Sequence, residues 1–204
     1  MRRVIAMGET ILDILFQNSQ PIAAVPGGSC FNSIISLGRT GTPSLFLGYT
    51  GNDLVGRQTI DFLKENGVDA EYFEMKEDEK SAISLAMLDE HGDANYVFYK
   101  TPPSISEHTP IPVFTHEDVL LFGSYYASCD GTRAYIRRIL EETRKAKTIV
   151  YYDLNFRRSH QHELDVLTPA ILSNLRQSTL VRGSSDDLEV IYGTREARDV
   201  YDRH

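Results

Sequence analysis

Short apolar runs bounded by Gly, Asp or Asn recur along the chain, and segments with apolar residues at helical spacing lie between them. Nearly continuous apolar runs are typical of strands buried on both faces of a parallel sheet. The predicted strands cover residues 4–7, 45–47, 119–122, 148–152 and 179–181. The predicted helices cover residues 29–37, 55–66, 132–147 and 168–177, the last with Thr168 as N-cap and Pro169 at the first helical position. This alternation predicts an α/β fold with a doubly wound parallel sheet and ligands at the carboxyl ends of its strands.

Residues 10–26 and 70–100 have a different pattern. Residues 11–16 and 82–88 alternate or run apolar, and residues 89–93 separate the second run from residues 96–100 as a hairpin turn would. Such strands do not fit easily into a parallel core. We therefore expect a small, mostly antiparallel β flap over one end of the sheet. The α/β core then comprises residues 1–9, 27–69 and 101–204.

Composition and charge argue against a nucleic-acid-binding, membrane-associated or secreted protein. The 204 residues carry a formal net charge of -8 with scattered Lys and Arg, which argues against a nucleic-acid partner. No apolar stretch approaches the roughly 18 residues of a membrane span, so no membrane association is expected. Gly8, Glu9 and Asp13 interrupt the apolar N-terminal segment, which disfavours a signal peptide. Cys30 and Cys129 form no CxxC motif, and the predicted location is the reducing cytoplasm.

The first candidate ligand site is the segment PGGSCFN at residues 26–32. Paired glycines before a helix let a ligand approach the backbone, where free N–H groups can donate to hydroxyls or phosphates. Asn32, one turn further on, offers a donor and an acceptor to a polyol. A tight turn without a ligand is an equally good interpretation of Gly27 and Gly28 alone. The chain contains neither GxGxxG nor GxxxxGK[ST], which disfavours a Rossmann dehydrogenase and a P-loop nucleotidase.

Several motifs together resemble those of the PfkB (ribokinase-like) carbohydrate kinase family. G-E-x-x-x-D at residues 8–13, GGxxxN at residues 27–32 and GxDxxG at residues 51–56 agree with the family in order and spacing. DLNFR at residues 153–157 is similar to the DxNxR of the fructokinase and 2-keto-3-deoxygluconate kinase branch. The resemblance spans essentially the whole chain. It implies a ribokinase-like fold, a flap that closes on a small-molecule sugar, ATP and Mg²⁺ as cofactors, and a homodimer through the flap.

The resemblance also implies roles for single residues on the sugar side. Asp13 is expected to accept hydrogen bonds from sugar hydroxyls, with Gly27, Gly28 and Asn32 around the same sugar. Asp53 of the GxDxxG motif is instead expected to cap the following helix.

Three flap residues alternate toward one face of a predicted strand. Tyr96, Phe98 and Lys100 are expected to cover the sugar, and Lys100 stands where relatives often have Arg. The alternative is that the two aromatic side chains form the core of the flap.

On the nucleotide side, the resemblance places Asn155, Ser184 and Asp187 toward Mg-ATP. The Ser184 and Asp187 match is weaker, because the family usually has Asn and Glu in these two places. Arg157 is expected to contact a substrate carboxylate or an ATP phosphate, since its planar fork suits both, and the alternative is a surface salt bridge.

The segment that carries the family's catalytic Asp, in a GAGD motif, is not found in this sequence. No catalytic residue is therefore assigned in this chain, and the core is expected to be incomplete at its C-terminus. The predicted function is ATP-dependent phosphorylation of a fructose-like sugar or a keto-sugar acid. The alternative is a truncated or inactive sugar-binding remnant of such a kinase.

Two other kinds of site are weaker hypotheses. His160 and His162 lack a third ligand, so no metal site is expected. A hydrolase that uses Ser124 or Cys129 as nucleophile would lack the GxSxG elbow.

Overall fold

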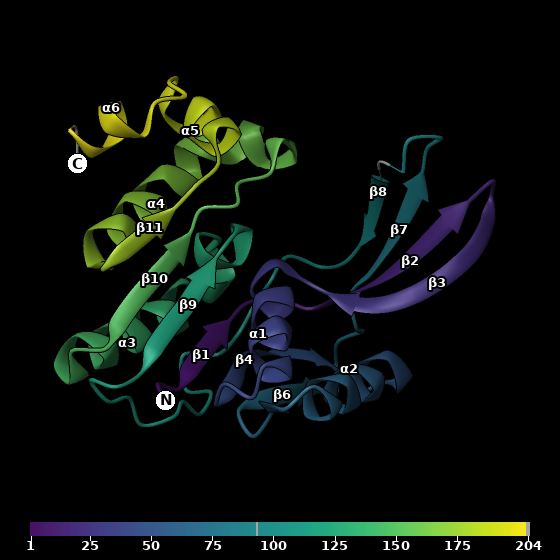
Figure 1. Ribbon diagram of the computed structural model, residues 1–204, viewed down its shortest axis with the longest axis horizontal. Helices are drawn as coiled ribbons and strands as arrows, with labels where there is room; N and C mark the ends of the chain where they lie inside the picture. Colours follow the sequence, from purple (N-terminus) through teal and green to yellow (C-terminus); the bar gives the residue numbers. More distant parts are fainter. Residues whose placement is uncertain (93, 203–204) are drawn as a thin grey trace.

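The computed structural model describes residues 1–92 and 94–202, and its largest element is a twisted parallel sheet (Figure 1). The strand order is β11-β10-β9-β1-β4-β5, with β6 also paired to β4, and every pair is parallel. The strands are β1 (Val4–Met7), β4 (Ser44–Gly51), β5 (Val68–Asp69), β6 (Phe73–Lys76), β9 (Val119–Gly123), β10 (Ile149–Asp153) and β11 (Leu180–Arg182). The predicted doubly wound α/β fold is confirmed.

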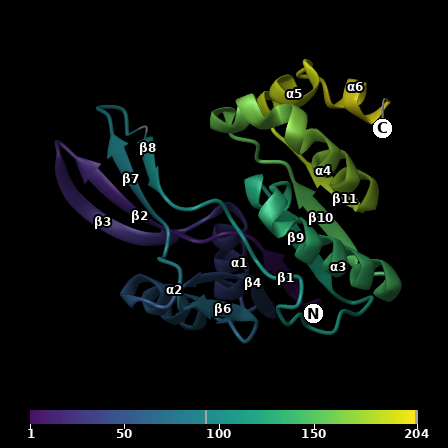
Figure 2. The same cartoon turned by 180° about the vertical axis from the view of Figure 1, so that it is seen from behind.

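Helices cover both faces of this sheet (Figure 2). The helices are α1 (Ser29–Arg39), α2 (Leu54–Glu65), α3 (Asp130–Ala146), α4 (Leu164–Gln177), α5 (Ser185–Tyr192) and α6 (Ala197–Tyr201). Because neighbouring strand residues point to opposite faces, Ile5 and Met7 of β1 pack with α3 and α4, whereas Ala6 packs with α1. Each large apolar side chain that is fully buried in this way contributes about 1.5–3 kcal/mol. Two apolar clusters therefore hold the sheet between its helix layers.

A second sheet projects from the end of the core (Figure 1). Its order is β3-β2-β7-β8, from strands β2 (Ile11–Gln17), β3 (Gln20–Gly27), β7 (Ile83–Leu88) and β8 (Ala94–Tyr99). The two outer pairs are antiparallel and the central β2–β7 pair is parallel. The predicted hairpin turn at residues 89–93 falls between β7 and β8, and residue 93 lies outside the described residues.

Two predictions about elements were wrong. Residues 73–76 were expected in the flap, but they form β6 of the core sheet, because the buried Phe73 ring packs 5.6 Å from the Phe46 ring. Helix α4 begins at Leu164 rather than after Thr168, since the short 3₁₀ helix η2 (Arg158–Glu163) leads directly into it. The Thr168 hydroxyl donates to the Leu164 carbonyl at 2.7 Å instead of capping a helix. Proline in the second turn removes a single helical hydrogen bond, which the packed helix tolerates.

Candidate functional site

The candidate site lies at the carboxyl end of β1, where the chain order of the sheet reverses. From β1 the chain first builds β4 and β5 on one side and later β9, β10 and β11 on the other. Open α/β sheets bind ligands at such a switch point. The chain leaves the core for β2 and β3 of the flap after β1 and returns at the start of α1; it enters the flap again for β7 and β8 and returns to the core after β8 (Figure 1). The site therefore lies where the core and the flap meet.

Asp13 on β2 is the central carboxylate of the site. It is partly buried, and its Oδ1 accepts a hydrogen bond from the hydroxyl of Ser84 on β7. A β-carbon at Gly27 would lie 2.6 Å from Asp13 Oδ2, so a larger residue there would push the Asp13 carboxylate out of its present position. Ser84 is the one donor to Asp13 found among the described residues, which leaves the carboxylate with capacity for further hydrogen bonds.

At Gly28, the start of α1 lies close to the backbone carbonyl of Glu9. The Gly28 φ of 132° is strained for other residues, and a β-carbon there would overlap the carbonyl oxygen of Glu9. Gly28 is the N-cap of α1, and no side chain caps this helix. The N–H groups of its first turn therefore remain available to an anion or a hydroxyl. Asn32 is exposed one turn further on, and its own N–H donates to the Gly28 carbonyl at 2.8 Å.

Lys100 connects the returning flap strand with the end of β1. Its Nζ lies 2.6 Å from Glu9 Oε2 and 5.6 Å from the centre of the Phe98 ring. The Tyr96 and Phe98 rings stack on the same face, with centroids 5.7 Å apart. They are 51% and 52% exposed, so the interpretation of these rings as flap core was wrong. Their exposed faces are available to cover a ligand.

A small polar cleft of about 30 Å³ lies between the Glu9–Lys100 pair and the end of β4. Tyr49 is in its wall, and the Nζ of Lys76 lies 3.7 Å from the centre of the Tyr49 ring and 2.7 Å from Glu79. The Tyr49 hydroxyl accepts a hydrogen bond from the Ser104 N–H at 2.9 Å. Burial raises the pKa of Tyr49 to about 12, so this phenol stays protonated at neutral pH.

Sequence reasoning missed Ser84 and Tyr49. Ser84 gave a usable signal, because it is a polar residue within the apolar run of β7, and it is fully buried. Tyr49 lies two residues before the GxDxxG motif at residues 51–56, but a motif does not predict where a long side chain points.

Asp53 has the structural role that the sequence predicts. Its Oδ1 accepts from the Gly56 N–H at 2.9 Å, which caps α2. The Ser81 N–H and hydroxyl donate to the same carboxylate at 3.0 and 2.7 Å. Desolvation alone would raise the pKa of Asp53, but the hydrogen bonds from Ser81 and Gly56 outweigh it and lower the pKa. Asp53 thus ties the flap entrance at Ser81 to α2.

The loop after β10 carries Asn155 and Arg157. Asn155 Nδ2 donates to the Ser124 hydroxyl at 2.7 Å, and both residues have positive φ angles, 36° and 58°. Arg157 is exposed just before η2, and none of the ion pairs found among the described residues includes it. The structure thus gives no support to the surface salt bridge considered for Arg157.

Ser184 and Asp187 form a capping box at the start of α5. Asp187 is 6% exposed; its Oδ1 accepts from the Phe156 N–H at 2.7 Å, and its Oδ2 accepts from the Ser184 N–H and hydroxyl at 2.7 and 2.9 Å. The carboxylate is therefore occupied by donors from the protein. It holds the loop after β10 against α5, which argues against direct contact between Asp187 and Mg-ATP.

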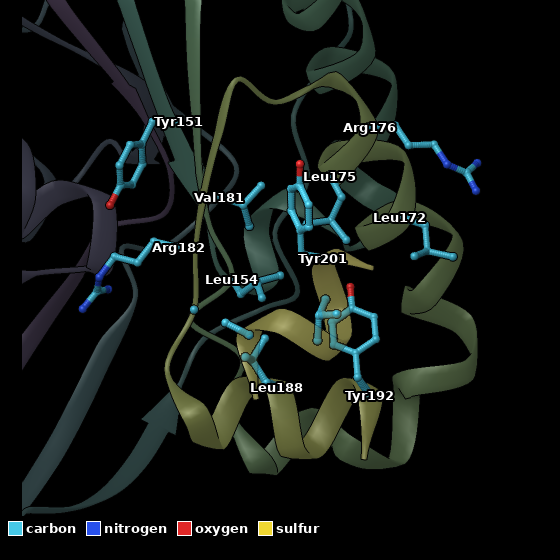
Figure 3. A pocket seen from close by; sticks show the side chains of 13 residues that line it. Tyr151, Leu154, Leu172, Leu175, Arg176, Val181, Arg182, Leu188, Tyr192 and Tyr201 are labelled. Atoms are coloured by element: carbon cyan, nitrogen blue, oxygen red, sulfur yellow. The ribbon is translucent and has the colours of Figure 1, made fainter. Parts of the chain in front are cut away.

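A cavity of about 660 Å³ lies beside β11 and between α4, α5 and α6, and neither Asp13 nor the Glu9–Lys100 pair lines it. Figure 3 shows Leu154, Val181, Leu188 and Tyr192 around it, while the charged ends of Arg176 and Arg182 point away. The mostly apolar lining does not suit a sugar. The sequence did not predict this cavity.

The structure adds no support for the metal site or the cysteine nucleophile that the sequence analysis considered. No cluster of three His, Cys, Asp or Glu side chains in the described part of the chain could hold a metal ion. The His160 ring stacks on Tyr125 and its Nδ1 lies 3.0 Å from Glu163. Burial raises the pKa of Cys129, so this thiol stays protonated. None of the described helices is long and apolar enough to cross a membrane.

A doubly wound sheet with a carboxylate and two glycines at its switch point, beneath a small β flap, is an arrangement typical of α/β proteins that bind small polar ligands. The family model described as pfkB family carbohydrate kinase matches residues 1–203. The chain belongs to this family of carbohydrate kinases.

Curated relatives agree with this assignment, and solved structures agree with the fold. The chain is 24% identical to Fructokinase-1 of Zea mays and 25% identical to Fructokinase-1 of Oryza sativa subsp. japonica, over 96% of its own length. It spans 64% of the length of these two relatives. The apo structure of fructokinase from Vibrio cholerae O395 matches with a TM-score of 0.88 at 22% identity, covering 100% of this chain and 70% of that one. Aminoimidazole riboside kinase from Salmonella enterica, complexed with aminoimidazole riboside and an ATP analog, matches with a TM-score of 0.84 at 21% identity, covering 97% and 65%.

Proposed function

We propose that this chain binds a sugar at the carboxyl end of β1 and forms the sugar-binding part of an ATP-dependent carbohydrate kinase. The observation that carries the proposal is the arrangement around Asp13, whose partly buried carboxylate has one protein donor, Ser84, and faces Gly27. A carboxylate held in this way accepts several hydroxyl hydrogen bonds at fixed geometry, which is how a polyol is recognised. The N–H groups at the start of α1 and the exposed Asn32 add donors on the same side.

The flap supplies the cover for this site in the proposed function. Tyr96 and Phe98 present stacked and half-exposed rings, and apolar ring faces pack well against the C–H faces of a sugar. Closure of such a cover excludes water from the reaction, which suppresses hydrolysis of the phosphoryl donor.

ATP with Mg²⁺ is the proposed phosphoryl donor. A solved relative, the Vibrio cholerae fructokinase, is described in a fructose, ADP and calcium ion bound form, and a sugar kinase of Pyrococcus horikoshii in complex with ATP. In this chain Arg157 is the residue proposed to contact a phosphate, with Asn155 beside it, because both follow the carboxyl end of β10. Mg²⁺ usually binds through substrate phosphates and one or two carboxylates, so it needs no cluster of protein ligands.

The chain's own part in the reaction is to bind and orient the sugar. Transfer of the γ-phosphoryl group also needs a base at the attacking hydroxyl. No residue of this chain is proposed for that step, because the sequence contains no GAGD motif. The second candidate function is sugar binding without phosphoryl transfer.

Two further predictions accompany the proposal. A homodimer through the flap is supported by the exposed side chains of β8, which include Val97 and Tyr99. A cytoplasmic location is supported by the two cysteines, which are both unpaired and buried.

A calorimetric titration with fructose, paired with an assay for ADP on the same sample, tests the proposal. We expect fructose binding in the wild-type chain and its loss in Asp13→Ala. ADP formation would establish the kinase function for this chain, and binding without ADP would establish the second candidate. Equal heats for the wild type and Asp13→Ala would contradict the assigned site.

A further inference from the structure

The Glu9–Lys100 ion pair lies where the sugar would bind in the proposed function. Glu9 directly follows Gly8 at the end of β1, and its carbonyl oxygen contacts Gly28 at the start of α1. Lys100 follows β8 of the flap, and its Nζ lies 2.6 Å from Glu9 Oε2. The side chains are only 20% and 27% exposed. The lysine charge is therefore neutralised by the chain itself in a partly desolvated place.

Two of the three lysines around this cleft are paired with a carboxylate of the chain. Lys76 lies 2.7 Å from Glu79 and over the Tyr49 ring. Lys100 is paired with Glu9. Lys80 lines the cleft but is exposed, and none of the ion pairs of the described residues includes it. Lys100 is therefore the lysine of the cleft that is both partly buried and next to the flap strand β8.

The carboxylate of Asp13 makes the proposed sugar site more negative. Its one protein donor in the described chain is the neutral hydroxyl of Ser84. A sugar hydroxyl can donate to this carboxylate, whereas a substrate carboxylate cannot and would be repelled by it. Asp13 and Glu9 together present two carboxylates to any ligand that enters beneath the flap.

We infer that Glu9 makes this site selective for neutral sugars over sugar acids by holding Lys100, the partly buried lysine next to the flap, so that this lysine does not bind a substrate carboxylate. The inference rests on the proposed function and narrows its substrate class. A sugar acid would have to break the Glu9–Lys100 pair and leave the Glu9 carboxylate desolvated beside its own charge. Like charges brought together in a desolvated site are strongly disfavoured.

The test compares D-fructose with 2-keto-D-gluconate, which has the same carbon chain with the C1 hydroxymethyl group replaced by a carboxylate. Both are titrated into the wild-type chain and into Glu9→Gln, which keeps the shape of the side chain and removes its charge. We expect the wild type to bind fructose about tenfold more tightly than the acid. In Glu9→Gln the ratio of the two affinities should move toward the acid by about tenfold. A ratio is unaffected by differences in the fraction of folded protein.

A second variant assigns the effect to Lys100. In the double variant Glu9→Gln/Lys100→Met, the gain in acid binding should disappear, because the freed ammonium group is removed. The control is Glu142→Gln on α3, which removes a carboxylate from an exposed ion pair with Lys145 (2.8 Å) far along the chain. This control should leave the ratio unchanged.

The outcomes separate the inference from the proposed function. Tighter binding of the acid than of fructose by the wild type, or an unchanged ratio in Glu9→Gln, would overturn the role of Glu9 while sugar binding stands. Failure of every variant and of the wild type to bind either sugar would overturn the proposed function, and the inference with it.

Discussion

Two aspartates that the sequence assigns to the site differ in how many hydrogen bonds the protein gives them: Asp13 on β2 has few, whereas Asp187 on α5 has several. Asp13 has Ser84 as its one described donor, and the N–H groups at the start of α1 have no side-chain cap. Asp187 instead receives three hydrogen bonds from Phe156 and Ser184. Unused hydrogen-bonding capacity thus distinguishes the aspartate that we propose to bind the sugar from the aspartate that stabilises the fold.

The comparison predicts opposite behaviour for the two aspartates. A saturated buried carboxylate should matter for stability and little for the choice of sugar. An unsaturated carboxylate should matter for binding and little for stability. The four predictions below test this contrast, from the largest expected effect on stability to the smallest.

Asp187→Ala should give the largest loss of stability. The substitution leaves the Phe156 N–H without its acceptor in a buried place and removes the capping box of α5. We expect a loss of about 3 kcal/mol, or a fall in Tm of about 6–12 °C. Urea unfolding followed by circular dichroism measures it. Asp186→Ala, at the exposed neighbouring position, should barely move the midpoint, and an equal effect of the two would show that Asp187 has no special role.

Gly28→Ala should reduce both stability and fructose binding. Its φ of 132° is unfavourable for alanine, and the added β-carbon would overlap the Glu9 carbonyl oxygen. We expect a loss of about 2 kcal/mol from backbone strain, together with weaker binding of fructose. The matched control is Gly41→Ala, where φ is 77° but nothing lies within 4 Å of a β-carbon. Fructose binding that survives in Gly28→Ala and falls in Gly41→Ala would contradict the assigned site.

Asp118→Asn should destabilise the fold in a way that depends on pH. Arg3 donates to Asp118 at 2.8 and 3.0 Å, and the Thr115 N–H donates at 2.8 Å. Desolvation alone would raise the pKa of Asp118, but these partners outweigh it and lower the pKa. The carboxylate therefore stabilises the fold above the unfolded-chain pKa of about 3.9, and this contribution is lost as the pH falls toward the lower folded pKa.

The expected loss for Asp118→Asn is about 1–2 kcal/mol at pH 7, reduced because Arg3 is partly exposed. Urea unfolding of the wild type and the variant at pH 7 and pH 4 measures it. The difference between the two proteins should shrink at the lower pH. A difference that stays constant or grows would contradict the lowered pKa.

The fold could be predicted from the sequence because its main signals are local. Apolar runs and helical spacing gave the strands β1, β4, β9, β10 and β11 and the helices α1, α2 and α3 to within a few residues, but they gave no sign of the two-residue β5 or of the short helix α5. β6 was placed in the wrong sheet because its partner, β4, lies more than 20 residues earlier in the chain, and a short strand such as residues 73–76 carries no signal for its partner. The start of α4 was misplaced because Thr168-Pro169 has the pattern of a helix start even inside a helix.

The candidate site was predicted less completely. Motif spacing gave Asp13, Gly27 and Gly28, which the structure brings together at the end of β1. It could not show that Asp187 is saturated, because its main partner, the Phe156 N–H, comes from a different loop. The Glu9–Lys100 pair, 91 residues apart in the chain, was also beyond the reach of local patterns.

Asp13→Asn should have the smallest effect on stability and the clearest effect on binding. Asparagine keeps the oxygen that accepts from Ser84, so the one described hydrogen bond of this side chain survives. We expect a change in stability within about 0.5 kcal/mol, because only a partly exposed charge is lost. Fructose affinity should fall at least about tenfold, since hydrogen bonds to a charged acceptor contribute about 1.5–3 kcal/mol. Unfolding and calorimetry on one preparation measure both quantities. A variant that loses several kcal/mol of stability but still binds fructose would reverse the roles assigned to Asp13 and Asp187.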